Sequence, residues 1–180
     1  MQPRIYDKVG HTLIQTFTCN KLSVRAKGQL QYQLWQNNDN QSFSLALSAN
    51  ESSGGFSAEL IQVDQILETL ARLSQDAKPF HAVALKGLFM GKSVNNASFL
   101  GAVLVDQNVI QPHSQTIRLL EVKADYQHWT THLSQHIKTK TELVQGESIH
   151  PPKPLSKKPS KNKVSLDETE ADNAVHQDQD

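Results

Sequence analysis

The sequence contains a single cysteine, Cys19, which excludes a disulfide within the chain and fits a reducing compartment. It contains no apolar stretch long enough to span a bilayer, and residues 1–15 lack the continuous apolar core of a secretory signal. We therefore expect a cytoplasmic protein with no membrane-spanning segment. A phosphate-cradling glycine-rich loop, a nucleophile elbow and an HExxH motif are also missing. Without these motifs we expect a protein that is not an enzyme and uses no cofactor.

Net charge is also absent, because 18 basic residues balance 18 acidic ones. The charges are nevertheless unevenly placed. In residues 20–59 the bases come first, and the acids Asp39 and Glu51 follow. From residue 80 to residue 105 the only charged residues are Lys86 and Lys92. A sheet built from these segments is mildly basic, which is a weak signature of a polyanion partner; ordinary scatter of surface charge is the alternative.

The first half of the chain has the alternating pattern of strands. Apolar residues recur at every second position in residues 22–27, 29–36 and 42–48, and residues 12–18 are also predicted as a strand. The alternation resumes at Phe56, Ala58 and Leu60. From Val63 the spacing changes to three and four residues, which predicts a helix that ends near Leu73. The first half is therefore predicted to be a ββββα unit.

The second half shares three short motifs with the first. Lys27-Gly28, Asn37-Asn38 and Ser42-Phe43 have counterparts in Lys86-Gly87, Asn95-Asn96 and Ser98-Phe99. This spacing indicates an internal duplication, over about residues 12–76 and 80–137. We expect strands at 80–86, 88–92, 98–105 and 116–122, and a helix at about 125–137.

The predicted fold is therefore α+β, with two ββββα repeats whose antiparallel sheets pack on two helices within a domain of residues 1–138. Residues 139–180 are rich in lysine and proline and then in acids, and they hold few apolar residues. Such a segment buries too little apolar surface to offset the entropy lost on ordering. We expect a disordered linker and an acidic tail, for which a solubilising role and recruitment of a protein partner are both open.

One face of the predicted sheet carries residues suited to single-stranded nucleic acid. Lysine and arginine neutralise phosphates, glutamine donates hydrogen bonds, and tryptophan stacks on bases. The candidate binding residues are Arg25, Lys27, Gln31, Gln33, Trp35, Lys86 and Lys92. Apart from Trp35, the same composition suits any solvated sheet face, and an exposed tryptophan also marks protein contacts.

The tandem ββββα order and the repeated motifs Lys-Gly, Asn-Asn and Ser-Phe resemble the Whirly and Pur-type nucleic-acid-binding proteins. The resemblance covers about residues 12–137. It implies curved antiparallel sheets that hold single-stranded DNA or RNA, with helices that form the core or the oligomer contact. We therefore expect a non-enzymatic protein that binds single-stranded DNA or RNA. The alternative is a protein-interaction or homo-oligomeric assembly module, in which residues 98–105 form an edge strand or an oligomer surface.

Three histidines, His128, His132 and His136, are spaced four residues apart on the second predicted helix. This spacing places imidazoles on adjacent turns, where a pair can chelate zinc or nickel. A structural zinc site usually has four ligands, and no cysteine lies nearby, so we expect no metal site. Cys19 has no distinctive neighbours and is expected to be a structural residue.

Overall fold

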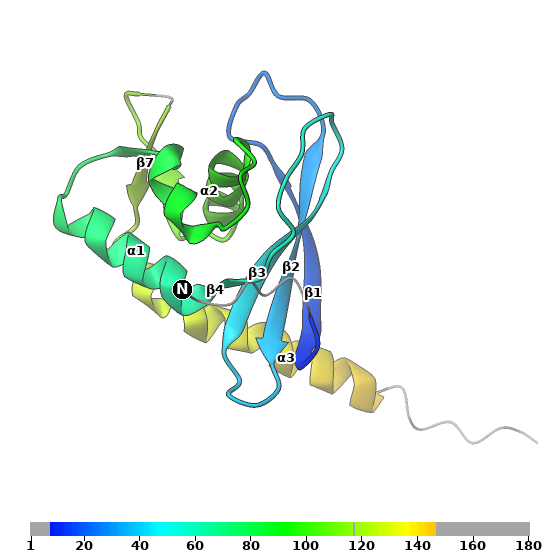
Figure 1. Cartoon of the computed structure of the whole chain (residues 1–180). Helices are drawn as coiled ribbons and strands as arrows, with labels where there is room; N and C mark the ends of the chain where they lie inside the picture. Colours follow the sequence, from blue (N-terminus) through cyan, green and yellow to red (C-terminus); the bar gives the residue numbers. More distant parts are fainter. Residues whose placement is uncertain (1–7, 117, 147–180) are drawn as a thin grey trace, which may run out of the picture. The chain divides into compact units, whose positions relative to one another are not determined.

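The computed structural model describes residues 8–116 and 118–146, which lie in one compact unit spanning Met1–Ser148. This part of the chain is α+β, as predicted, with two antiparallel sheets and several helices (Figure 1). The predicted linker and acidic tail lie outside the described residues from residue 147 onward. No helix among the described residues is long and apolar enough to cross a membrane.

The first sheet has four strands in the order β1-β2-β3-β4, with antiparallel neighbours. Its strands are β1 (His11–Asn20), β2 (Gln29–Asn37), β3 (Phe43–Asn50) and the short β4 (Ile61–Gln62). The predicted alternation in β2 is confirmed, because Leu30, Tyr32 and Leu34 are all 0% exposed. This apolar side of the sheet is its inner face.

Helices cover the inner face. Helix α1 (Val63–Gln75) follows β4 directly and contacts β3, as the change of hydrophobic spacing at Val63 predicts. Helix α3 (Trp129–Gly146) contacts β1, where the ring of His136 packs edge-on against Phe17 with centroids 5.4 Å apart. Phe17 in turn stacks on Tyr32 at 5.0 Å. The strands and helices of both halves therefore share one core.

The predicted strand at residues 22–27 is wrong, since this segment is a loop of turns and bends. Ser23 explains the difference. Its carbonyl accepts a hydrogen bond from the amide of Ala26, and its hydroxyl accepts one from the amide of Arg25. Serine readily closes such local turns in place of sheet pairing. Val24, which alternation in a strand at 22–27 would bury, is 92% exposed.

The second half of the chain also differs from the prediction. Its elements are β5 (Phe80–His81), the 3₁₀ helix η1 (Ala82–Leu88), α2 (Asn96–Asp106), β6 (Ile110–Pro112), β7 (Leu119–Val122), the 3₁₀ helix η2 (Tyr126–His128) and α3. The three strands form a small sheet in the order β5-β7-β6. The strand predicted at 80–86 is reduced to the two residues of β5, and the strand predicted at 88–92 is wrong, since no residue of this segment is in a strand. The strand predicted at 116–122 and the helix predicted at 125–137 are present as β7 and α3.

Residues 98–105, predicted as a strand, lie inside helix α2, so that prediction is wrong. A run of apolar residues this short fits a buried strand and a buried helix equally well. Gly101 lets the helix that forms here pack closely on its neighbours. A side-chain carbon added at Gly101 would lie 3.0 Å from Leu22 and 3.5 Å from Ala82 and Leu120. Leu100, Val103 and Leu104 are at most 2% exposed, so α2 is core and cannot serve as the edge strand or oligomer surface expected of residues 98–105.

The predicted repeat is not confirmed, because its matching motifs occupy different structures. Gly28 has a φ of +69° in a turn, whereas Gly87 lies in η1. Asn37 closes the β2–β3 turn through its side chain, but Asn95 precedes a helix. The domain boundary predicted at residue 138 also falls inside α3, which continues to Gly146.

Candidate nucleic-acid interface

The structure separates the predicted binding residues into two groups. Gln31, Gln33 and Trp35 lie on β2 and point away from the core, since they alternate with its buried residues. The four predicted cations, in contrast, lie outside the strands. Arg25 and Lys27 are in the loop at 21–28, Lys86 is in η1, and Lys92 is in the loop at 89–95. Strands β1 to β3 hold no Lys, Arg, Asp or Glu, so the predicted basic sheet face is instead a neutral one.

Side-chain hydrogen bonds tie the loop at 21–28 to the connection between β3 and β4. The Lys21 ammonium donates to the carbonyl of Lys27 at 2.8 Å and to the hydroxyl of Ser52 at 2.5 Å. The carboxylate of Glu51 accepts from the amide of Gln29 at 2.6 Å. Gly28 lies against Glu51, where an added side-chain carbon would be 2.8 Å away. The two loops therefore pack in direct contact.

The β3–β4 connection is also bonded to the loop at 89–95. The hydroxyl of Ser93 and the side-chain amide of Asn95 both donate to the carbonyl of Gly55, at 2.5 and 3.1 Å. Because residues 51–55 contact both neighbours, the three loops meet at one end of the first sheet. We call the loops at 21–28, 51–58 and 89–95 the three-loop surface; Figure 1 shows these loops beside the start of α2.

Two buried polar side chains, Glu59 and Asn96, bind the backbone of the three-loop surface. The carboxylate of Glu59 is 3% exposed and accepts hydrogen bonds from the amides of Met90 and Gly91, at 3.1 and 3.0 Å. Asn96 is 1% exposed; its side chain accepts from the amide of Ser57 at 2.9 Å and donates to the carbonyl of Gly91. These bonds satisfy backbone groups that burial would otherwise leave unpaired.

The three-loop surface is basic and partly apolar. Its cations are Lys21, Arg25, Lys27 and Lys92. Its one acid is Glu51, and that carboxylate already accepts a backbone amide. Val24 and Val94 are 92% and 89% exposed, and Met90 is 40% exposed. Exposed apolar groups among cations suit a ligand that is both anionic and partly apolar.

The outer face of β2 is occupied by a smaller cluster around Trp35. The Lys8 ammonium lies 4.7 Å from the Trp35 ring centroid and donates to the Gln33 side chain at 3.3 Å. The indole N–H donates to the same Gln33 oxygen at 3.2 Å. The ring is therefore half-buried and already has a cation over its face. Trp35 is also six residues along β2 from Gln29, about 20 Å at the usual rise per residue.

Cys19 is a buried structural residue. Burial, with a smaller contribution from the negative charge of Asp106, raises the pKa of its thiol to about 12. Since the thiolate is the reactive form, the native thiol is inert at neutral pH. Burial, followed by a hydrogen bond to Asp106, also raises the pKa of the neighbouring Tyr32.

The three histidines do not converge on a metal site. His136 packs on Phe17, while His128 and His132 are exposed. No group of three or more His, Cys, Asp or Glu residues in the described ranges is arranged to hold a metal ion.

Comparison with protein families, with curated proteins and with solved structures found no match for this chain. The candidate interface therefore depends on its own geometry. Sequence reasoning missed Lys21 and Lys8 as members of charged clusters. No local pattern marks Lys21, because its role depends on a loop that lies 31 residues away in the sequence. Lys8 gave equally little signal, because its partners Gln33 and Trp35 lie on β2, at least 25 residues later in the sequence.

Proposed function

We propose that this protein binds single-stranded nucleic acid, without catalysis, through the three-loop surface. The observation that carries the proposal is the bonding of residues 51–55 to both neighbouring loops, which gathers Arg25, Lys27 and Lys92 at one end of the sheet. These three residues were predicted as binding residues and are separated by up to 67 positions in the sequence.

The chemistry of this surface favours a single strand over a duplex. Cations contribute affinity by releasing counterions from phosphates, and this term is independent of base sequence. The bases of a single strand are unpaired, so their faces can pack on Val24, Val94 and Met90, which a duplex would not allow. A single-stranded nucleic acid that continues from the loops along β2 meets the amide groups of Gln31 and Gln33 before it reaches Trp35.

The test is fluorescence anisotropy with labelled single-stranded DNA and RNA of about 12 nucleotides, within the usual footprint of such proteins. We expect binding by the full chain, and at least a tenfold loss when Arg25, Lys27 and Lys92 are all replaced by alanine, since each phosphate contact contributes affinity. Lys78→Ala is the matched control, because Lys78 is an exposed lysine outside the three-loop surface. Equal affinity of the triple variant and the control would contradict the proposal.

The same exposed residues favour the alternative, a protein-interaction module. Val24 and Val94 are nearly fully exposed apolar side chains on adjacent loops, as at many protein contacts. If oligonucleotides do not bind, light scattering of the wild type and of a Val24→Ser, Val94→Ser variant tests this function. Self-association that these substitutions abolish would support the alternative.

A further inference from the structure

A second candidate site, independent of the three-loop surface, lies where α1 ends beside β7. The pairing between β5 and β7 ends at Phe80 and Leu120, and the chain before Phe80 turns away toward α1. A cleft of about 310 Å³ remains next to the last residues of β7. It is lined by Leu73, Ser74, Ala77, Lys78, Pro79, Glu121 and Val122. This volume suits a small ligand.

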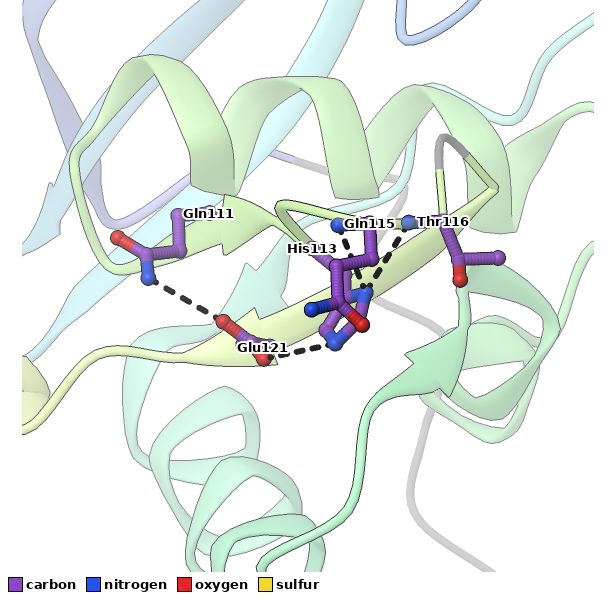
Figure 2. Close-up of polar contacts among 5 residues, drawn as sticks. All are labelled: Gln111, His113, Gln115, Thr116 and Glu121. Carbon is purple, nitrogen blue, oxygen red and sulfur yellow. Dashed lines mark hydrogen bonds and ion pairs between the residues drawn. The ribbon is translucent and has the colours of Figure 1, made fainter.

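The carboxylate of Glu121 is held in position at the edge of this cleft by two side chains (Figure 2). Gln111, its partner across the strands, donates to one carboxylate oxygen at 3.3 Å. The ring nitrogen Nε2 of His113 lies 3.5 Å from the other oxygen. Glu121 retains 35% exposure of its side chain, so it remains accessible to a ligand.

The two supporting side chains orient Glu121 without neutralising it. The other ring nitrogen of His113, Nδ1, accepts hydrogen bonds from the amides of Gln115 and Thr116, at 3.3 and 3.1 Å (Figure 2). A nitrogen that accepts two amides carries no proton, so the ring is neutral and its proton is on Nε2, facing Glu121. Gln111 is also neutral. Among the described residues, no lysine or arginine forms an ion pair with Glu121.

The rest of the cleft combines apolar side chains, a helix C-terminus and one cation. The C-terminal end of α1 brings partial negative charge from the helix dipole. Leu73, Pro79 and Val122 supply apolar walls. Lys78 is the single cation among the lining residues, and it forms no ion pair with a described residue.

We propose that this cleft binds a primary ammonium group on a short aliphatic chain, with Glu121 as the charge partner. The ammonium donates to the Glu121 carboxylate, and its methylene groups pack on Leu73 and Val122. A free alkylamine and the side chain of a lysine in another protein share this chemistry. No covalent step is involved.

The test is a titration of the full chain, followed by the backbone amide NMR signals of residues 73–78 and 121–122. The probes are n-butylammonium, Nα-acetyl-lysine amide and the neutral control n-butanol. We expect saturable shifts at these positions with one or both ammonium probes and none with butanol. Tighter binding of the lysine derivative identifies a protein lysine as the source, and tighter binding of butylammonium identifies a free amine. No saturable shift with either probe, or equal shifts with butanol, would overturn the proposal.

Two variants test the role of the charges. Glu121→Gln keeps the shape and the exposure of the side chain, and should weaken binding at least about tenfold, as for loss of a charged hydrogen-bond partner. Lys78→Ala should strengthen binding, because it removes the like charge that lines the cleft. Unchanged binding in both variants would contradict the assignment, and their NMR signal dispersion shows whether each is folded.

Discussion

Tyr32 joins the first sheet to two helices through partly buried polar bonds at the edge of the core. Its hydroxyl donates to the carboxylate of Asp106 at 2.5 Å and accepts from the side-chain amide of Gln107 at 2.5 Å. Gln107 also accepts from the indole N–H of Trp129 at 3.2 Å. The tyrosine ring itself is fully buried and stacked on Phe17. One residue thus links β2, the end of α2 and the start of α3.

Replacing Tyr32 by phenylalanine should destabilise the protein by about 1–3 kcal/mol, because the Asp106 carboxylate and the Gln107 amide each lose a partner. Urea unfolding followed by circular dichroism measures this free energy. Tyr126→Phe is the matched control, since among the described residues the Tyr126 hydroxyl makes only a 3.4 Å contact, with the adjacent Gln127. An equal effect of the two substitutions would show that the network contributes nothing.

The ionisation of Cys19 should make the free energy of unfolding depend on pH in the alkaline range. Burial raises the pKa of its thiol from the ordinary value of 9.0 to about 12. Between these two values the thiol ionises in the unfolded chain but not in the native one, so its stabilising contribution is complete below pH 9 and is lost as the pH rises.

The measurement is the urea midpoint at about pH 7.5 and about pH 10.5, within this linkage window. The midpoint should fall less in Cys19→Ala than in the wild type, because the variant has no thiol to ionise. Parallel declines in the two proteins would contradict the buried, protonated thiol.

At the scale of elements, the contact between the β3–β4 connection and the loop at 89–95 shapes the three-loop surface. Gly91 lies against Ser57, and a side-chain carbon there would be 2.7 Å from the Ser57 Cβ and closer still to its hydroxyl. The amide of Gly91 also binds the buried carboxylate of Glu59. Gly91 is therefore a position where the Ser57 side chain leaves no room for a Cβ.

Gly91→Ala should destabilise the protein by about 1–3 kcal/mol, through overpacking at this contact. Gly87→Ala is the control, because nothing lies within 4 Å of a carbon added at Gly87. Thermal unfolding compares the two variants. A melting temperature for Gly91→Ala at or above that of the control would show that the contact between Gly91 and Ser57 can open without loss of stability.

Elements with a clear hydrophobic period were predictable from the sequence, and those without one were not. Strand β2 and helix α1 follow their periodicity closely, since burial on one side determines both patterns. Helix α2 is apolar on every side, and such a run does not indicate which backbone conformation buries it. The loop at 21–28 alternates like a strand, but the hydrogen bonds that Ser23 accepts from nearby amides close a turn there in place of sheet pairing. Three of the candidate cations, Arg25, Lys27 and Lys92, lie on loops and not on the sheet, and their binding role stays a prediction.

At the scale of the whole molecule, charge is separated from the sheet surface. Strands β1 to β3 contain no Lys, Arg, Asp or Glu, and cations gather on the loops at one end of the sheet. The outer face, whose own strands carry no charged side chain and which Lys8 covers in part, and the basic loop end are therefore distinct surfaces. A ligand bound mainly by phosphate contacts belongs at the loops.

The salt dependence of oligonucleotide binding tests this account most directly. For single strands, the slope of log affinity against log salt changes by about 0.7 for each phosphate contact. The full chain should show a steep negative slope, and replacement of Arg25, Lys27 and Lys92 by alanine should reduce it by about 2. Binding that is insensitive to salt, or a slope that the triple substitution leaves unchanged, would contradict a phosphate-binding role for the three-loop surface.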